Sequence, residues 1–407
     1  MQSGIAGIKA LWRGTLVAHC GRPVALGIGG DPALLRHRLV AGKSFRASHG
    51  PAVEERGPKG TGRDASRDHR GKRAGHLRLA AADRVRRLLE GILLAAAAVI
   101  VTHNSEKVIE RCLNALSEMA PEVTRVVVDN ASADNTVERA RRSAGTLVIA
   151  NTENRGFAAA VNQGMRATNA AYSLLLNPDV RLLAGIDALV DASERYGLAA
   201  GRLVDVDGRT QAGFTIRRFP TPWSLIFELA GINRLWPGNP VNRRYRYLDR
   251  DLTRGGSVEQ PAGAFLLTRR DVWQKLGGLD EDFHPIWFED VDYATRAVEA
   301  GYRIEYVPSV TAEHDGAHSI NQVPTGCLAE WWCANLTQYA AKHFGALGYR
   351  AICAAVVLTS APRMVAGMIQ ARSFTPITTY CKIVRLAGTR LVSARRVRGG
   401  AETKHIS

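Results

Sequence analysis

From about residue 95 onward, hydrophobic residues form short continuous runs that alternate with segments of helical periodicity. A short continuous apolar run is typical of a strand buried on both faces, and apolar residues three and four positions apart are typical of an amphipathic helix. Strands that alternate with helices predict a mostly parallel sheet with helices on both faces, that is, an α/β fold. The pattern predicts strands at 95–102, 124–129, 147–150 and 172–176, and helices at 108–116, 135–144 and 156–167.

Polar residues follow the expected strands where those strands end. The first strand leads to His103-Asn104, the second to Asp129-Asn130, the third to Asn154-Arg155-Gly156 and the fourth to Asp179. In open α/β sheets, ligands bind beyond the carboxyl ends of the strands. The sequence therefore predicts a binding site at this edge of the sheet.

The first fifth of the chain differs from the rest in charge and pattern. Residues 1–90 carry 18 Lys and Arg against 7 Asp and Glu, which accounts for most of the net charge of +16. Residues 42–75 show almost no apolar periodicity, and such a composition cannot offset the entropy of ordering. We expect residues 1–91 to be a basic, largely disordered and solvated arm. Weak electrostatic attraction to an anionic membrane surface or to nucleic acid is the less favoured interpretation. Translation from a later start codon is an alternative. No specific binding of nucleic acid is expected, because the rest of the chain carries little excess charge.

Composition and cysteine spacing limit the class of protein. A chain of 407 residues with 46% hydrophobic residues can bury one large core or two smaller ones, which excludes a fibrous or wholly disordered protein. The six cysteines form no CxxC pair and no regular framework. We therefore expect reduced thiols in a cytosolic setting rather than disulfides or a zinc site.

Three carboxylates lie close together at Glu289, Asp290 and Asp292, next to the aromatic residues Trp287 and Phe288. One interpretation is the first turn of a helix, where acidic residues are favoured by the helix dipole and by capping. The other is a general base in a partly dry cleft, where burial and like charge raise the pKa of a carboxylate. The local sequence alone favours the first interpretation.

The order of several motifs along the chain favours the interpretation as a general base. Segments 101–104, 128–134, 154–162 and 176–179 resemble the successive nucleotide-sugar motifs of the inverting family 2 glycosyltransferases. Segments 263–270 and 277–281, and Glu289-Asp290 with Arg296 and Gly301, resemble the acceptor half of the same family. The resemblance spans about residues 95–320 and is closest to the rhamnosyltransferase-like branch of bacterial cell-surface polysaccharide synthesis. It implies the GT-A fold, a Rossmann-like and mostly parallel sheet that binds a nucleotide-diphospho-sugar.

The resemblance assigns the donor site to the strand ends. Asp129 would accept hydrogen bonds from the nucleoside, although a turn or helix cap explains the same residue. The segment 154–162 would bring backbone N–H groups at a helix N-terminus close to the diphosphate. An ordinary turn with an exposed arginine is the alternative. The donor-binding residues implied are Thr102, Asn104, Asp129, Asn154, Arg155, Gly156 and Asn162.

A divalent cation, Mg²⁺ or Mn²⁺, is the implied cofactor. Asp179 lies where the family carries its metal-binding Asp-x-Asp, but this chain reads Asn177-Pro178-Asp179 and has one carboxylate only. One aspartate can suffice when two diphosphate oxygens complete the ligands of a hard cation. His314 resembles the family's diphosphate-side histidine and is the second expected ligand, while His318 is expected at the surface or on phosphate.

The resemblance makes Asp290 the general base, with Glu289 and Asp292 raising its pKa or orienting it and the acceptor. The expected reaction is inverting transfer of a sugar, L-rhamnose or a similar one, from a nucleotide-diphospho-sugar. The acceptor would be a hydroxyl of a glycan or of a polyprenyl-diphosphate-linked glycan in cell-envelope synthesis. One alternative is a catalytically silent binding protein that acts through its basic ends. Another is a nucleotidyltransferase, although 103–107 lacks the glycine-rich basic loop that this activity requires.

Two further segments suggest a location. Residues 217–254 interleave aromatic residues with arginines, which suits a lipid-diphosphate acceptor at a membrane edge or a flexible insertion over the cleft. The apolar run 351–369 contains Pro362, which is expected to interrupt it and leave too few residues to span a bilayer. A helix that lies in the cytoplasmic leaflet is expected, and a helical pair packed on the catalytic domain is the alternative. The expected organisation is a basic arm at 1–91, a GT-A domain at 92–325 and a helical tail at 326–407, in a cytoplasmic protein peripheral to the inner face of the membrane.

Overall fold

The structure is a computed structural model that describes residues 96–316 and 322–393. The arm expected at 1–91 and the expectation for His318 lie outside the described residues. All described residues belong to one compact unit. The expected division at 325/326 into a GT-A domain and a helical tail stays a prediction.

The first part of the sheet is parallel and follows the predicted pattern. Its order is β3-β2-β1-β4, and the runs predicted at 124–129 and 172–176 match two of these strands without shift. Along β1, Ala98 and Ile100 pack into one hydrophobic cluster while Val99 and Val101 pack into another, so both faces of the strand are buried. This two-sided burial explains why the run is continuously apolar. The bounds are β1 Ala96–Thr102, β2 Thr124–Asp129, β3 Thr146–Ala150 and β4 Tyr172–Leu176.

The sheet continues past β4 with strands of both directions. Its order there is β10-β6-β11-β5, and β8 pairs with β11 at its edge. Because β10 is antiparallel to both β4 and β6, and β11 is parallel to β6, six of the nine strands in this sheet run the same way. The mostly parallel α/β sheet expected from the sequence is confirmed. The bounds are β5 Val180–Leu182, β6 Gly197–Val204, β8 Gly256–Val258, β10 Phe265–Arg269 and β11 Arg303–His314, with a small separate pair of β7 Ile216–Arg217 and β9 Gln260–Pro261.

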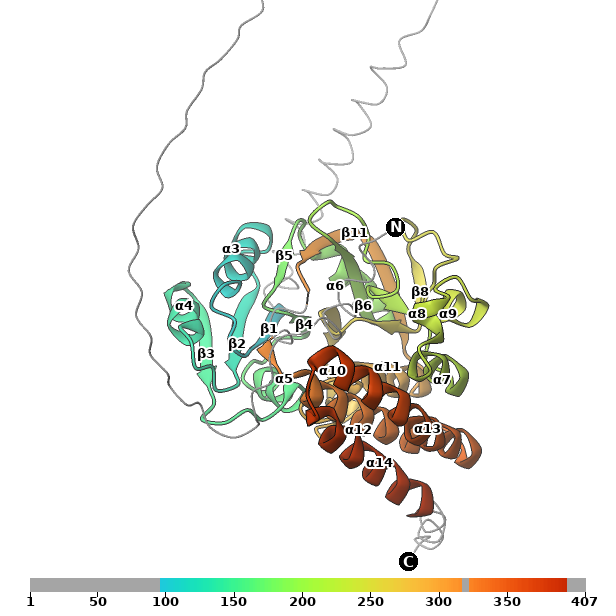
Figure 1. Ribbon diagram of the computed structural model, residues 1–407. Coiled ribbons are helices and arrows are strands. Elements are labelled where there is room, and N and C mark those ends of the chain that lie inside the picture. Colours follow the sequence, from blue (N-terminus) through green and yellow to red (C-terminus); the bar gives the residue numbers. More distant parts are fainter. Residues whose placement is uncertain (1–95, 317–321, 394–407) are drawn as a thin grey trace, which may run out of the picture. The chain divides into compact units, whose positions relative to one another are not determined.

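Helices cover both faces of the sheet (Figure 1). On one face, α3, α4 and α6 contribute Ile109, Ala140 and Leu189 to the first cluster. On the other face, α5, α10 and α11 contribute Met165, Val272 and Tyr293 to the second. The bounds are α3 Ile109–Met119, α4 Thr136–Arg142, α5 Phe157–Arg166, α6 Asp187–Tyr196, α10 Arg270–Lys275 and α11 Glu289–Glu299.

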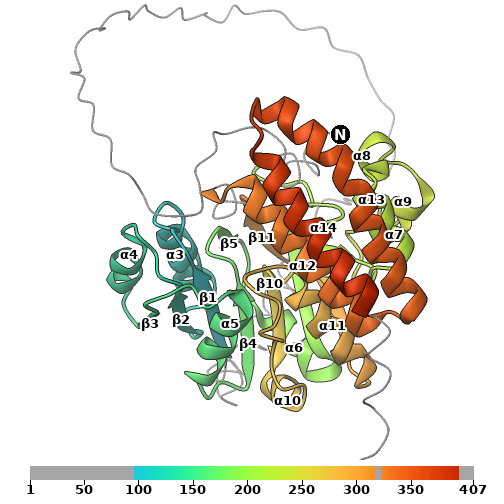
Figure 2. The same ribbon diagram turned by 60° about the horizontal axis from the view of Figure 1, so that its bottom comes forward.

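A third hydrophobic cluster joins α11 to the C-terminal helices and to α7. It includes Val291 of α11, Leu225 of α7, Tyr339 of α12, Val356 of α13 and Ile383 of α14. Figures 1 and 2 show α12, α13 and α14 packed together beside these elements. The aromatic and basic segment 217–254 is thus built into the fold rather than lying over it as a flexible insertion. The bounds are α7 Pro222–Leu229, α8 Ile232–Leu235, α9 Pro240–Tyr245, α12 Thr325–His343, α13 Ala346–Ala371 and α14 Thr375–Ser393.

The expectation that Pro362 interrupts the apolar C-terminal run is wrong, because α13 continues through it over 26 residues. Proline removes one helical N–H, but packing outweighs this loss: Ile352, Val356 and Ser360 are buried against neighbouring helices. Just beyond the proline, Nη2 of Arg363 donates to the carbonyl oxygen of Leu229 at 2.5 Å. By length and mean hydropathy of 1.7, α13 is the one helix in the described part of the chain that could cross a membrane.

Candidate active site

The loops after β1 and β2 are held together by Asp129. Its Oδ1 accepts hydrogen bonds from Thr102 Oγ1 at 2.7 Å and Ser132 Oγ at 2.5 Å, and its Oδ2 accepts the Ser132 N–H at 2.8 Å. Asn104, with φ of 50°, donates its N–H to Ser132 Oγ and accepts the Ala133 N–H. The structure thus brings Thr102, Asn104 and Asp129 together. Because Asp129 is only 1% exposed and accepts three hydrogen bonds, it shapes this slot, and its direct contact with a nucleoside stays a prediction.

The turn into α5 differs from the expectation. Asn154 and Arg155 are exposed, but Gly156 donates its N–H to Asn154 Oδ1 at 2.9 Å and Phe157 donates its N–H to the Pro285 carbonyl at 2.7 Å. The idea that the first N–H groups of this helix are free for a diphosphate is therefore wrong for these two. Gly156 has φ of 83°, and a Cβ there would lie 2.7 Å from His284 Nδ1. The glycine is required by this close approach within the protein.

Asn162 was expected to bind the donor, and this prediction is wrong. Its side chain is buried between α5 and the turn before the acidic segment, with 1% exposure. Nδ2 donates to Leu279 O at 2.8 Å and to Glu281 Oε1 at 2.9 Å, while Oδ1 accepts the Leu279 N–H and Trp273 Nε1. Because both amide hydrogens and the oxygen are used, Asn162 anchors the turn and has no group left for a ligand.

Asp179 and His314 lie together at the end of the sheet. Antiparallel pairing of β5 with β11 places His314, the last residue of β11, opposite Val180. Nε2 of His314 lies 3.5 Å from Oδ1 of Asp179, and both residues are buried. Two residues that are far apart in the sequence, and that were predicted to share one metal, are therefore neighbours in space.

Gln211 orients the His314 ring, and the sequence gave no indication of this role. Nε2 of Gln211 donates to the His314 carbonyl at 2.7 Å, so its Oε1, at 2.9 Å from Nδ1, accepts the ring N–H. The Phe214 ring stacks on the imidazole at a centroid distance of 5.0 Å. Burial lowers the pKa of His314, which favours the neutral ring. The unprotonated Nε2 then points its lone pair towards Asp179.

The acidic segment is indeed the first turn of a helix, α11, entered through two residues in the left-handed region. Trp287 has φ of 80° and Phe288 has φ of 74°, a conformation that is costly for side chains of this size. The Phe288 ring packs against Tyr339 of α12 at 5.6 Å, which holds this entry in place. The helical interpretation and the general-base interpretation are thus compatible.

Asp290 is fixed by backbone hydrogen bonds to both carboxylate oxygens. Oδ2 accepts the Gly263 N–H at 3.0 Å and Oδ1 accepts the Val291 N–H at 2.8 Å. Burial raises the pKa of Asp290, and the two N–H groups and the charge of Arg217 partly offset this rise. Burial, rather than the neighbouring carboxylates, is thus the main cause of the raised pKa. A half-buried carboxylate with a raised pKa is suited to accept a proton.

Glu289 is buried more deeply than Asp290, with 4% exposure. Its Oε2 has no hydrogen-bond partner among the residues that the structure describes. Burial, followed by the charge of Asp290, raises the pKa of Glu289 well above its usual value. Glu289 therefore tends to remain protonated where Asp290 is ionised.

Replacing Glu289 with Gln is expected to make the stability of the protein less dependent on pH. The unfolded chain loses the Glu proton near pH 4.3, whereas folded Glu289 holds it to higher pH, so wild-type stability falls as pH rises between these two values. Gln has no proton to lose there. Melting temperatures at pH 5 and pH 8 would test this, with the exposed Glu299→Gln on the same helix as the control. If the melting temperature of the Glu289 variant changes between pH 5 and pH 8 as much as that of the wild type, the raised pKa of Glu289 would be contradicted.

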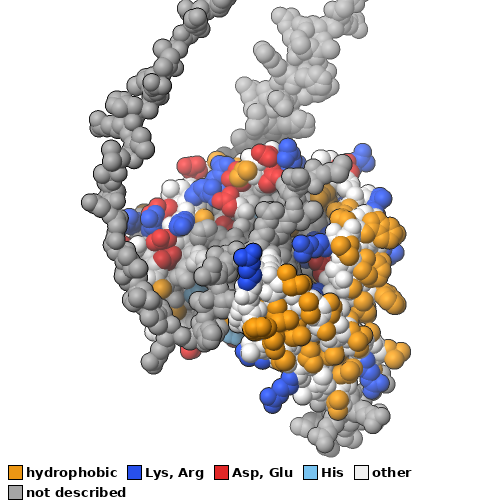
Figure 3. All heavy atoms as spheres, viewed as in Figure 1, with side chains coloured by type: hydrophobic (Ala, Val, Ile, Leu, Met, Phe, Trp, Pro, Cys, Tyr) orange, Lys and Arg blue, Asp and Glu red, His pale blue; other side chains and the backbone are white. Residues whose placement is uncertain are grey.

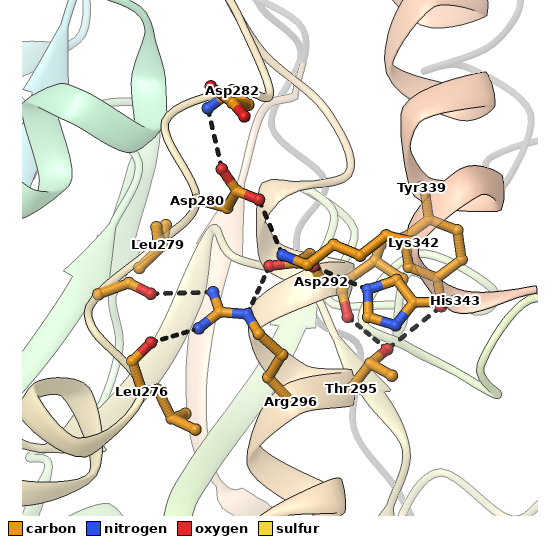
Figure 4. A network of polar contacts seen from close by, with 12 residues as sticks. Leu276, Leu279, Asp280, Asp282, Asp292, Thr295, Arg296, Tyr339, Lys342 and His343 are labelled. Atoms are coloured by element: carbon orange, nitrogen blue, oxygen red, sulfur yellow. Dashed lines mark hydrogen bonds and ion pairs between the residues drawn. The ribbon is translucent and has the colours of Figure 1, made fainter. Parts of the chain in front are cut away.

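Asp292 contacts basic residues of α11 and α12 (Figure 4). Its Oδ1 contacts Lys342 Nζ and His343 Nε2, both at 2.7 Å, and its Oδ2 accepts from Arg296 Nε at 2.7 Å. These partners lower the pKa of Asp292 despite its complete burial. The expected role of orienting Asp290 or the acceptor is therefore corrected: Asp292 connects α11 to α12.

Comparisons with known proteins decide the family. The profile of Glycosyl transferase family 2 matches residues 97–277. An N-acetylglucosaminyl-diphospho-decaprenol L-rhamnosyltransferase of Mycobacterium tuberculosis is 33% identical over 271 residues, which cover 61% of this chain and 84% of that protein. The chain belongs to glycosyltransferase family 2. This family 2 glycosyltransferase is also 26% identical to the rhamnosyltransferase WbbL of Escherichia coli over 60% of the chain and 92% of that protein.

Among solved structures, this family 2 enzyme is similar to a mannosyltransferase of Pyrobaculum calidifontis in complex with GDP-Man and Mn²⁺. The TM-score is 0.41 at 17% identity, covering 74% of this chain and 87% of that one. Membership of family 2 shows that the chain is a glycosyltransferase rather than a nucleotidyltransferase or a silent binding protein. The mostly parallel order of its sheet is the one that the motifs implied.

A divalent cation fits the site of this family 2 enzyme, although the protein supplies few ligands. Within residues 96–316 and 322–393, no group of three or more His, Cys, Asp and Glu side chains could hold a metal. Asp179 supplies a carboxylate, and His314 supplies a neutral nitrogen whose other ring N–H is held by Gln211. This is the usual arrangement of a metal-binding histidine. Two protein ligands leave coordination positions for water and substrate phosphates, as Mg²⁺ and Mn²⁺ often require.

Arg217 is a second residue whose place in the site the sequence did not reveal. Its Nε donates to Gly213 O at 2.8 Å, and its guanidinium lies 6.0 Å from the centroid of the Phe214 ring that stacks on His314. Its charge also lowers the pKa of Asp290. Arg217 thus lies near the Phe214 ring that stacks on His314 and is close enough to Asp290 to influence its pKa. The sequence signal was present, because Arg217 begins the basic and aromatic segment that was assigned to a membrane edge.

Replacing Arg217 with Ala is expected to move the acid limb of the pH–rate profile to higher pH. Loss of a neighbouring positive charge raises the pKa of a carboxylate, so Asp290 would be ionised only at higher pH. Measurement of kcat/KM against pH tests this. Arg217→Lys should retain most of the wild-type limb, and Arg209→Ala, at a guanidinium 68% exposed, should leave it unchanged. If the acid limb lies at the same pH in Arg217→Ala as in the wild type, Arg217 does not influence the pKa of Asp290.

Proposed function

We propose that this enzyme transfers L-rhamnose, or a similar sugar, from a nucleotide-diphospho-sugar to a hydroxyl of a lipid-linked glycan, with inversion at the anomeric carbon. The observation that carries the proposal is Asp290, a half-buried carboxylate anchored by two backbone N–H groups and with a raised pKa. The rhamnosyltransferase names of the two relatives support the choice of sugar.

The proposed chemistry is one displacement. Asp290 accepts the proton of the acceptor hydroxyl while the hydroxyl oxygen forms a bond to the anomeric carbon. The bond between that carbon and the diphosphate oxygen breaks, and the nucleoside diphosphate leaves with the electron pair. Attack from the face opposite the leaving group inverts the anomeric centre without a covalent sugar–enzyme intermediate. Asp179 and His314 would hold a divalent cation, which neutralises the charge that develops on the diphosphate.

For the acceptor, we propose a sugar attached to a polyprenyl diphosphate. The Mycobacterium tuberculosis relative is named for N-acetylglucosaminyl-diphospho-decaprenol, and the match covers 84% of its length. Such an acceptor is held in a membrane by its polyprenyl chain. We therefore also propose that the enzyme works in the cytoplasm at the inner face of the cell membrane.

A two-stage experiment tests the proposal. Thermal-shift measurements with nucleotide-activated L-rhamnose, GDP-mannose and UDP-N-acetylglucosamine, with and without Mn²⁺ or Mg²⁺, should show the largest stabilisation for the rhamnose donor with metal. Incubation with that donor and a short-chain N-acetylglucosaminyl-diphospho-prenol should then yield an acceptor heavier by one deoxyhexose. Stronger stabilisation by another nucleotide sugar would show that the donor sugar is that one and not L-rhamnose. The absence of transfer to this acceptor would overturn the acceptor assignment.

A further inference from the structure

The α7–α8 segment and α13 expose several large apolar side chains. Trp223 is 67% exposed, Leu235 86% and Trp236 60%. On α13 and the turn after it, the exposed residues are Leu347, Leu358, Val365, Ile369 and Phe374. Figure 3 shows hydrophobic side chains gathered over these helices, with Lys and Arg at the margins. Soluble monomers rarely expose apolar area on this scale without a partner.

The exposed residues belong to elements that pack side by side. A Cβ at Gly348 of α13 would lie 3.1 Å from Pro222 Cγ, so the start of α13 packs against the start of α7. Near the other end, Arg363 of α13 donates to the carbonyl oxygens of Leu229 and Glu228, where α7 leads into α8. We call the exposed side chains of α7, α8, α13 and the turn at Phe374 the apolar face.

The charge around the apolar face is mostly positive. Residues 331–393 contain seven Lys and Arg and no Asp or Glu, and 232–248 contain four Arg and no acid. The acidic residue of α7, Glu228, is paired with Arg246. Arg234, Arg350 and Arg372 are exposed on the elements that carry the apolar face. Exposed tryptophans with arginines at the margin match the boundary of an anionic bilayer, where indole rings lie at headgroup depth and arginines bind phosphate.

The geometry of α13 favours lying along the bilayer over crossing it. Only 28% of its most apolar window is buried in the protein, although its length and composition would allow a span. However, Ile352, Val356 and Ser360 are buried against neighbouring helices, and Arg363, in the second half of the helix, is bound to α7. A spanning helix would have to separate from α7 at this point and would leave Arg363 without these carbonyl partners in the lipid.

The same helices are packed onto the catalytic helix. Leu225 and Leu229 of α7 share a hydrophobic cluster with Val291, the residue after Asp290, and with Val356 of α13. The helices that carry the apolar face are therefore packed in one cluster with the helix that carries Asp290. A lipid-linked acceptor could reach Asp290 from a membrane bound to the apolar face while its lipid chain stays in the bilayer.

We infer that the apolar face is a docking surface for an anionic lipid bilayer, with α13 lying along the bilayer and α8 inserting Leu235 and Trp236. This inference rests on the proposed function for its biological purpose, but not for its test. It places the contact on the folded catalytic unit, at α7, α8 and α13.

Flotation of the full-length protein with vesicles tests the inference. Phosphatidylcholine vesicles that contain phosphatidylglycerol should bind the protein about tenfold or more tightly than phosphatidylcholine alone. The double variant Leu235→Ser, Trp236→Ser should lower binding to anionic vesicles about tenfold, and Trp223→Ser should lower it by a smaller factor. Val206→Ser is the matched control, because Val206 is 73% exposed in the turn after β6 and lies outside the apolar face.

The outcomes separate this inference from its alternatives. Equal vesicle binding by the wild type and the α8 double variant would overturn it and assign any membrane contact to the basic charges alone. A dimer by light scattering that the double variant converts to a monomer would replace the bilayer by a second copy of the chain. The double variant should retain turnover on a short-chain, water-soluble acceptor and lose it on an acceptor embedded in vesicles. Failure on both acceptors by the wild type, with vesicle binding intact, would contradict the proposed function alone.

Discussion

Asp290→Asn is expected to lower kcat about 10³-fold, the contribution that a positioned general base typically makes. Asn has the same shape and can still accept the Gly263 N–H, so the start of α11 should keep its geometry. It cannot accept the proton of the acceptor hydroxyl. The affinity for the nucleotide sugar, measured by calorimetry, should stay within about twofold, because binding of the donor does not need the base.

The control for this substitution is Asp282→Asn, an exposed aspartate in the turn before α11. It should leave kcat and donor affinity unchanged. Turnover by Asp290→Asn close to the wild-type value would remove Asp290 from the role of base. Loss of donor binding in the same variant would instead indicate that Asp290 contacts the donor.

The pH dependence of the wild type follows from the same residue. Asp290 must be ionised to accept a proton, and burial raises its pKa above the usual value of about 3.9. The rate should therefore fall as pH drops through a value above that of an ordinary aspartate. This acid limb should be absent from the residual activity of Asp290→Asn.

Asp292→Asn is expected to lower the free energy of unfolding by about 3 kcal/mol, the range found when one partner of a buried ion pair is removed. Asp292 is fully buried, and the substitution leaves Arg296, Lys342 and His343 without their shared negative charge. Urea unfolding at neutral pH measures the change. Asp280→Asn is the matched control, because Asp280 contacts only Lys342 of the three, at a partly exposed site, and should cost at most about 1 kcal/mol.

The sign of the pH dependence also identifies this network. The folded pKa of Asp292 is depressed, so its contribution to stability is complete above the unfolded value of about 3.9 and is lost as pH falls below it. The difference in stability between the wild type and Asp292→Asn should thus shrink on acidification below pH 4. A difference that stays constant there would show that packing of the side chain, and not its charge, holds α11 to α12.

The short-range pattern of apolar residues was enough to predict much of the sheet. The runs at 124–129 and 172–176 became β2 and β4, since a strand buried on both faces must be apolar at successive positions. Pro362 shows the limit of this reasoning. A local rule for proline predicted a break, but burial of Ile352, Val356 and Ser360 keeps α13 continuous.

The order of the motifs predicted which residues lie close together in the folded chain. It did not predict which groups each side chain contacts. Asp179 and His314 meet because β5 and β11 are paired, as the motifs implied. Asn162 belongs to the same set of motifs, yet its amide is consumed by Leu279, Glu281 and Trp273. Gln211 and Arg217 were missed because neither lies in a motif, and their roles depend on a turn after β6 that only the folded chain defines.

By itself, the sequence determined the α/β class, the family and the acidic segment that holds the proposed base, because these depend on periodicity and on residue types at fixed spacing. Only the tertiary structure decided how three adjacent carboxylates differ. Asp290 is held by two backbone N–H groups, Glu289 is buried without a partner for Oε2 among the described residues, and Asp292 is paired with cations of α11 and α12. The physical reason is that the pKa of a carboxylate depends on its burial and its partners, and here the partners come from segments far away in the chain.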